Sequence, residues 1–200
     1  MVDARVVESR TFSGEDWYGD DLANTQFLAC TFDDVDLSEA VTSGAVFESC
    51  TFRSCRFNSS THTDTAFVAC EFRRCNFFDA TFTGCKVAGS TFAECALRPV
   101  RIVGGMWRGV VLRHANLARL ELTGLDLREA DLSAADLTGT VLRDANLEGV
   151  TVREAVLHDT DLRGANLDRV DLAAAQLRGT KLDVAGAVHL AEQVGAVVGE

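Results

Sequence analysis

Large apolar residues recur along this chain at every fifth position, in one unbroken register. From Phe12 to Leu182 these central positions carry numbers ending in 2 or 7, and 33 of the 35 hold Phe, Leu, Trp, Val or Ile. The two exceptions are Thr42 and His62. A period of five is neither the 3.6 of an α-helix nor the 2.0 of a β-strand, so each unit must direct one large residue inward and then turn a corner. The pattern predicts a solenoid.

Two further classes of position keep the same register. Two residues before each centre, from Cys30 to Ala185, the residue is Cys, Ala, Val, Ser, Thr or Gly, except at Leu120 and Leu125. Thirteen of the 16 glycines have numbers ending in 4 or 9, where the chain is expected to turn. The remaining positions are mostly polar and should face water. All seven cysteines fall in the small class: Cys30, Cys50, Cys55, Cys70, Cys75, Cys85 and Cys95.

Units such as ADLSA (130–134), ADLTG (135–139) and ANLEG (145–149) show the repeat in its fullest form. In these residues the chain resembles the pentapeptide repeat family over about residues 12–185. The resemblance implies an all-β solenoid, a right-handed quadrilateral β-helix with twenty residues per turn. The sequence supports that number, because Thr42 and His62 are twenty residues apart and the cysteines repeat the same step. These two side chains should stack in one column and hydrogen-bond to each other, which favours a structural role for His62.

The five-residue register ends at Leu182, and helical spacing follows it. Asp183 can cap a helix, and we divide the chain into a β-helix of residues 1–182 and a C-terminal helical segment of residues 183–200. Such a helix can cap the last coil or cover the same element of a second subunit. It resembles the closing helix of the mycobacterial fluoroquinolone-resistance subgroup of the family, which implies a homodimer. The expected interface comprises Leu182, Val184, Ala187, Val188, Ala191, Val194 and Val198.

Charge is concentrated near the N-terminus of an acidic chain. Lys and Arg number 19 against 30 Asp and Glu, a net charge of −11, which disfavours binding to nucleic acid. Residues 11–40 contain eight acids and no base. Acidity on a solenoid can serve solubility alone, but the absence of Lys and Arg from this stretch favours a partner-binding acidic tip. The tip comprises Glu15, Asp16, Asp20, Asp21, Asp33, Asp34, Asp36 and Glu39.

The sequence gives little support for catalysis, a metal or a cofactor. The cysteine pairs should lie at adjacent interior corners as buried free thiols, so packing is favoured over metal binding. Phosphate-binding glycine motifs and nucleophile elbows are lacking. We expect no catalytic residue, metal, cofactor or small-molecule substrate. The absence of an apolar run of about 18 residues argues against a membrane span, and a charged opening stretch favours the cytoplasm.

The family resemblance also implies a function. Members of the subgroup bind DNA gyrase by imitating duplex DNA in shape and charge, and so inhibit the enzyme or protect it from fluoroquinolones. Duplex DNA carries one charge per ~1.7 Å, far more than this chain, so any imitation is partial and must rely on shape as well. The alternative is a non-catalytic structural or protein-interaction scaffold with another partner, which needs no particular placement of acids.

Overall fold

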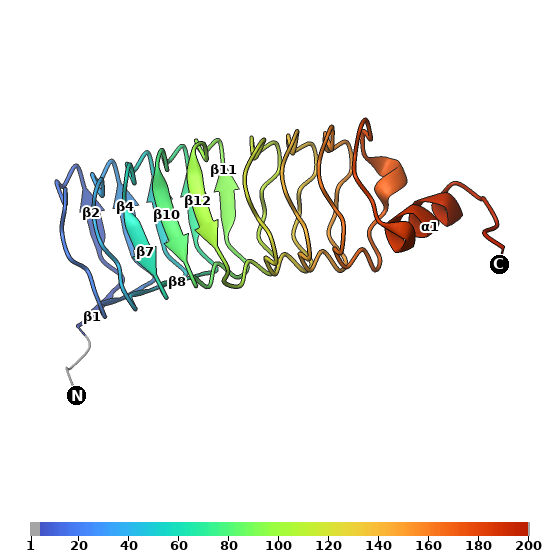
Figure 1. The fold of residues 1–200 in the computed structure, drawn as a ribbon. Coiled ribbons are helices and arrows are strands. Elements are labelled where there is room, and N and C mark those ends of the chain that lie inside the picture. Colours follow the sequence, from blue (N-terminus) through green and yellow to red (C-terminus); the bar gives the residue numbers. More distant parts are fainter. Residues whose placement is uncertain (1–4, 200) are drawn as a thin grey trace.

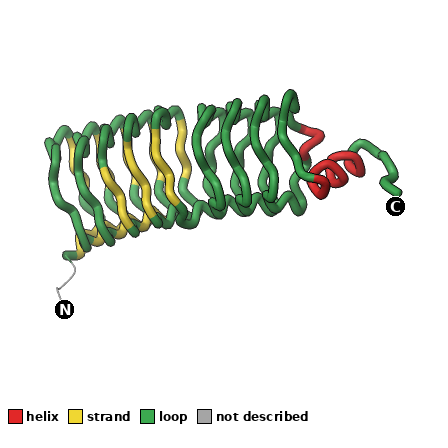
Figure 2. The backbone as a smooth tube through the Cα atoms, viewed as in Figure 1, coloured by secondary structure: helices red, strands yellow, loops and turns green. Residues whose placement is uncertain are grey.

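The chain forms a four-sided parallel β-solenoid followed by one short helix (Figure 1). The computed structural model describes residues 5–199. Most of each coil is drawn as loop between very short strands (Figure 2). The elements are β1 (Val6–Glu8), β2 (Thr11–Ser13), β3 (Gln26–Leu28), β4 (Thr31–Asp33), β5 (Val46–Glu48), β6 (Thr51–Arg53), β7 (Thr61–Thr63), β8 (Ala66–Val68), β9 (Glu71–Arg73), β10 (Ala80–Thr83), β11 (Thr91–Ala93), β12 (Val100–Val103), the 3-10 helix η1 (Leu172–Ala174) and α1 (Val184–Gln193).

Successive coils pair in parallel with a step of twenty residues. The strands form three sheets, in the orders β1-β3-β5-β8, β12-β10-β7 and β11-β9-β6-β4-β2. Phe27 pairs with Phe47, and Phe47 with Phe67. Single bridges carry the same step onward as far as Asp161 and Lys181. The solenoid and its twenty-residue coil, predicted from the sequence, are confirmed. Because β1 pairs with β3, the solenoid already includes residues 6–8. The two segments assigned from the sequence, residues 1–182 and 183–200, include residues 1–4 and 200, which lie outside the described part of the chain.

The central residues fill the interior. In the N-terminal half they form columns of stacked phenylalanine rings: Phe32 and Phe52 lie 4.5 Å apart between ring centroids, and Phe52 and Phe72 lie 4.7 Å apart. In the C-terminal half leucine takes over, and Leu132 and Leu137 are fully buried. The cysteines are free thiols, buried except for half-buried Cys95. They pack beside these columns, as the small class of position predicts.

The corners are turned in left-handed backbone at the positions ending in 4 or 9. Side-chain-bearing residues occupy many of them, for example Ala29 (φ 52°) and Arg74 (φ 54°). Glycine at a corner is therefore a preference and not a requirement in this fold. Pro99 also falls at a corner, where its ring forbids positive φ, and the Arg98–Pro99 peptide bond is cis.

The two polar central residues contact each other as predicted. Thr42 Oγ1 and His62 Nδ1 are 2.6 Å apart, and the other ring nitrogen, Nε2, lies 2.9 Å from Ser60 Oγ. All three side chains are buried. Burial lowers the pKa of His62 to about 3, so the ring is neutral at physiological pH. Both nitrogens have partners inside the closed core, which supports a structural role for this histidine.

Candidate partner-binding surfaces

The acidic tip lies in the first two coils, at the end where the chain begins (Figure 1). Asp33 ends β4 on the face shared with β2, where it pairs with Ser13. Asp16 and Asp36 pair on the next face, and Asp21 pairs with Val41 on the face after that. The acids are therefore brought to one end of the rod, but they surround it on three faces and do not form one flat patch. Arg5 and Arg10 line the same open end.

Three of the acids have a structural role that the sequence analysis missed. Asp16 Oδ1 accepts a hydrogen bond from the Tyr18 N–H at 3.1 Å, and Asp21 and Asp36 accept the equivalent bond from Ala23 and Ser38. The same bond recurs far from the tip, at Asp131, Asp136, Asn146 and Asn166. An Asp or Asn before a central residue therefore caps a turn. The repeated ADL and ANL units were the available signal.

One arginine of the following coil neutralises part of the tip. Arg56 lies 3.4 Å from Asp34 Oδ1 and 3.1 Å from Asp36 Oδ2. Burial would raise the pKa of Asp36, but hydrogen bonds from Ser38 and the Arg56 guanidinium outweigh it and lower that pKa. The other six acids make no salt bridge with any described residue: Glu15, Asp16, Asp20, Asp21, Asp33 and Glu39. These six are the charges available to a partner's cations.

Aromatic residues stand among these acids. Tyr18, the only tyrosine of the chain, is 57% exposed. Its pKa is raised by a hydrogen bond to Glu39 and by the charges of Glu39 and Asp36. Trp17 Nε1 donates to Glu15 Oε2 at 2.9 Å. Exposed aromatic side chains such as Tyr18 are typical of protein contacts, whereas Trp17 is half-buried and packs against the core. Neither residue belongs to the tip predicted from the sequence.

The C-terminal helix α1 covers the last coil with one of its sides. The carboxylate of Asp183 caps it, as predicted, by accepting from the Gly186 N–H at 2.8 Å, and it also accepts from Gly164 in the preceding coil. These backbone bonds lower the pKa of Asp183. A Cβ at Gly186 would lie 3.2 Å from the side chains of Leu167 and Leu182, so only glycine fits without a shift. Helix and coil are thus in close contact.

The opposite side of this segment leaves apolar residues uncovered. Val184 is 81% exposed, Val194 68% and Val198 48%. Of the other residues expected at a dimer interface, Ala187 is exposed, whereas Val188 and Ala191 are half-buried. Leu182 packs against the core instead, as does Leu190, which the sequence analysis did not select. The helix therefore caps its own coil and still presents a second apolar side.

Within residues 5–199, no group of three or more His, Cys, Asp or Glu side chains is placed to hold a metal ion. No helix of the same range has the length and apolarity to cross a bilayer.

The twenty-residue coil, the five-residue unit and the buried columns of Phe and Leu define a quadrilateral β-helix. The family model described as "Pentapeptide repeat region" matches residues 75–152. A second family model, described as "Pentapeptide repeats (8 copies)", matches residues 29–61 and 145–183. The chain belongs to the pentapeptide repeat family.

A solved structure, that of trypsin-treated QnrB1, agrees with this fold. Trypsin-treated QnrB1, a plasmid-mediated fluoroquinolone resistance protein, is 22% identical with a TM-score of 0.55, and the match covers 98% of each chain. HetL of the cyanobacterium Nostoc sp. strain PCC 7120, a pentapeptide repeat protein involved in heterocyst differentiation regulation, is 18% identical with a TM-score of 0.32, covering 88% of this chain and 84% of HetL. No curated protein matches the sequence. Identities this low show the fold alone.

Proposed function

We propose that this protein binds DNA gyrase at surfaces that normally hold duplex DNA, and so inhibits the enzyme or protects it from fluoroquinolones. The observation that carries the proposal is the acidic tip, in which six carboxylates have no salt bridge with described residues. A rigid rod presents them, because the coils are joined by backbone hydrogen bonds on their faces. The fold is shared with QnrB1, whose own role is fluoroquinolone resistance. The action is binding without catalysis.

The proposal includes a homodimer joined through the exposed side of α1 and the residues that follow it. Val184 of the helix, with Val194 and Val198 beyond its end, would be covered by the same residues of a second copy, since two identical segments can pair about a twofold axis. The two acidic tips would then lie at opposite ends of a longer rod. Such a dimer would present gyrase with a rod that has the length and the terminal charge of a DNA segment.

Reversing charge at the tip should weaken gyrase binding without unfolding the rod. We expect the triple variant Asp20→Lys, Asp33→Lys, Glu39→Lys to bind at least about tenfold more weakly at low salt, because these exposed carboxylates cap no turn. The matched control is Asp144→Lys, Asp159→Lys, Asp168→Lys, which makes the same charge change on exposed acids of the C-terminal half. The measurement is affinity for immobilised gyrase, alongside supercoiling inhibition with and without a fluoroquinolone. An equal loss of gyrase affinity in the two variants, or no loss in either, would exclude the acidic tip as the surface that contacts gyrase.

Charging the exposed side of α1 should dissociate the dimer. We expect the wild-type protein to have twice the 21.6 kDa mass of one chain in light scattering, and Val184→Glu with Val194→Glu to have the mass of one chain. A buried carboxylate at the interface would lack a partner. The control is Val6→Glu, a half-exposed valine at the opposite end of the rod. A monomeric wild-type protein contradicts this part of the proposal.

The second candidate function is a non-catalytic scaffold with a different protein partner. The observation that favours it is the structural role of Asp16, Asp21 and Asp36, which cap turns as their counterparts do elsewhere in the rod. These acids need no partner to explain them. Affinity for gyrase that is absent, or that does not fall as salt rises, would support the scaffold over the mimic.

A further inference from the structure

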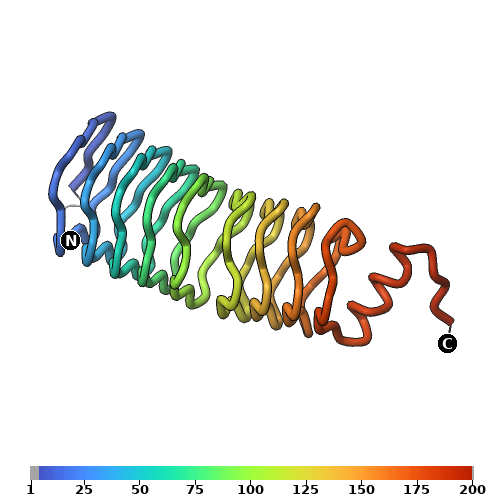
Figure 3. Tube along the Cα trace, turned by 90° about the horizontal axis from the view of Figure 1, so that it is seen from above, coloured from blue at the N-terminus to red at the C-terminus, as the bar shows by residue number. Residues whose placement is uncertain are grey.

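The backbone ladder is open in the middle of the rod on two neighbouring faces. On one face Asn76 pairs with Ala96, but the next bridge joins Asn116 to Asp136. On the adjacent face β12 is the edge of its sheet, and bridging resumes only at Glu121. The other two faces stay paired, through Met106 and Val111. We call the open part, where residues 94–104 face residues 113–123, the seam; it lies between the green and yellow-green coils of Figure 3.

The seam leaves backbone groups without their usual partners. Before it, the Phe77 N–H donates to Ala96 O at 2.8 Å, and after it the Leu117 N–H donates to Asp136 O at 2.8 Å. The equivalent N–H groups of Leu97 and Ile102 make no such bond within residues 5–199. Gly84 donates to Val103 O at 2.9 Å, whereas Gly104, its counterpart one coil later, has no matching bond there. The outer edge of β12 therefore offers alternating donors and acceptors, like any unpaired strand edge.

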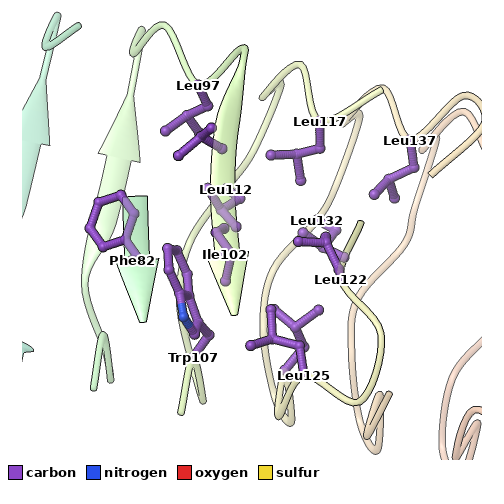
Figure 4. Close-up of a pocket in the computed structure, with 12 residues that line it drawn as sticks. Phe82, Leu97, Ile102, Trp107, Leu112, Leu117, Leu122, Leu125, Leu132 and Leu137 are labelled. Atoms are coloured by element: carbon purple, nitrogen blue, oxygen red, sulfur yellow. The ribbon is translucent and has the colours of Figure 1, made fainter. Parts of the chain in front are cut away.

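Particular residues build this opening. Pro99 has no N–H to donate and cannot take the corner conformation. Leu120 and Leu125, the two large residues at small positions, lie on the coil across the seam. Leu97 and Leu117 are buried on either side, so the apolar core continues through it. Figure 4 shows leucines of the far side facing Phe82 and Trp107 around a cavity of only about 20 Å³. The core is thus closed where the backbone is open.

Basic side chains surround the open edge. Arg98 and Arg119 line a surface cleft of about 330 Å³ together with Pro99, and exposed Arg101 belongs to β12. These three seam arginines form no salt bridge with the described residues. Arg98 donates a hydrogen bond to Asn116 Oδ1 across the seam at 3.1 Å. Two acids in register with the seam accept hydrogen bonds from hydroxyl groups, Asp79 from Ser59 and Glu121 from Thr123. In a chain of net charge −11, the seam arginines are a local group of positive charges.

An exposed phenylalanine adjoins the same edge. Phe78 is 51% exposed and is the one Phe of the chain outside the central positions. Ala80 pairs with Val100, which places Phe78 in register with Arg98 one coil later. The next residue, Asp79, donates its N–H to Pro99 O at 2.7 Å. The exposed ring of Phe78 therefore lies beside the seam arginines and offers an apolar contact.

We propose that the seam binds an extended, acidic segment of a partner protein, which adds as a strand to the outer edge of β12. Its carboxylates would pair with the seam arginines, and its backbone would complete the missing hydrogen bonds. A polypeptide fits better than a nucleic acid, because the edge offers both donors and acceptors while a phosphate backbone only accepts. The net charge of the chain also repels nucleic acid. This inference stands apart from the proposed binding to gyrase.

The test uses a fluorescent, acetylated and amidated octapeptide in which Asp alternates with Val, titrated against the full-length protein at low salt. We expect binding by fluorescence anisotropy, weakened at least about tenfold when alternate peptide nitrogens are methylated, since methylation removes strand pairing but keeps the charge. The triple variant Arg98→Glu, Arg101→Glu, Arg119→Glu should lose binding. The matched control, Arg10→Glu, Arg53→Glu, Arg178→Glu, changes exposed arginines away from the seam and should retain it.

Hydrogen exchange locates the bound peptide. In the free protein the Gly104 amide should exchange faster than that of Gly84, and peptide should slow exchange at Gly104 and Ile102. No binding of the peptide, equal binding of the methylated peptide, or equal loss in the control variant would overturn the proposal. So would tighter binding of a single-stranded oligonucleotide, or self-association of the protein through the seam that excludes the peptide. Circular dichroism confirms that each variant is folded.

Discussion

Replacing Phe52 by Ala should lower the free energy of unfolding by about 3–5 kcal/mol. The ring is fully buried and stacks between Phe32 and Phe72 with centroid distances of 4.5 and 4.7 Å. The cavity left by the ring cannot close easily, because β6 is paired to β4 on one side and β9 on the other. Urea unfolding followed by circular dichroism at neutral pH measures the loss.

The same substitution at Phe78 provides the control. It removes the same atoms from a side chain that is 51% exposed and lies outside the central positions. We expect less than about 1 kcal/mol there. Equal losses for Phe52→Ala and Phe78→Ala would show that the central column is not what stabilises the coil.

The fold could be predicted from the sequence because one physical constraint acts on every unit. A closed coil accepts only a large apolar side chain at its centre and a small one beside it, so the register is visible without any structure. The coil length was readable from the residues that depart from this pattern. Thr42 and His62 are tolerated because they contact each other, and residues stacked in one column lie one coil apart.

The seam could not be predicted in the same way. Whether two coils pair depends on backbone N–H and C=O groups. Every residue carries the C=O and every residue except proline carries the N–H, so the side-chain pattern does not reveal the pairing. Pro99, Leu120 and Leu125 each departed from their class, but the two leucines lie more than twenty residues after the proline, on the next coil. Only the coil geometry shows that these departures adjoin one opening.

The candidate site was predicted in part. The sequence placed the acids at one end of the rod, but it did not separate those that cap turns from those that are free to bind. The pairing of Asp36 with Arg56 follows from the twenty-residue step once that step is known. The pairing of Asp34 with the same arginine crosses between columns, so it required the positions of the side chains.

The buried polar cluster around His62 connects the fold to pH. Its ring lies between Thr42 and Ser60 and packs on Phe82, with 4.7 Å between ring centroids. No acidic group is among the causes of its lowered pKa, which is due to burial. A protonated ring would therefore be a buried charge without a counter-ion, and acid should destabilise the rod through this one position.

Lowering the pH from 7 to 4 should destabilise wild-type protein by about 3 kcal/mol more than the His62→Phe variant. The pKa of His62 is about 3 in the folded chain against 6.5 for the free side chain. Between these values the unfolded chain binds a proton that the folded chain does not, so stability falls as pH falls.

The His62→Phe variant should fold, because the new ring fits the column above Phe82. Ser60 keeps its hydrogen bond to Phe57 O, and Thr42 keeps its hydrogen bond with Thr65 Oγ1. Carboxylates with lowered pKa, such as Asp131 and Asp136, lose stabilisation in acid in both proteins and cancel in the comparison. Urea unfolding at pH 7, 5.5 and 4 measures the difference, and parallel curves for the two proteins would show that His62 accepts its proton within the folded rod.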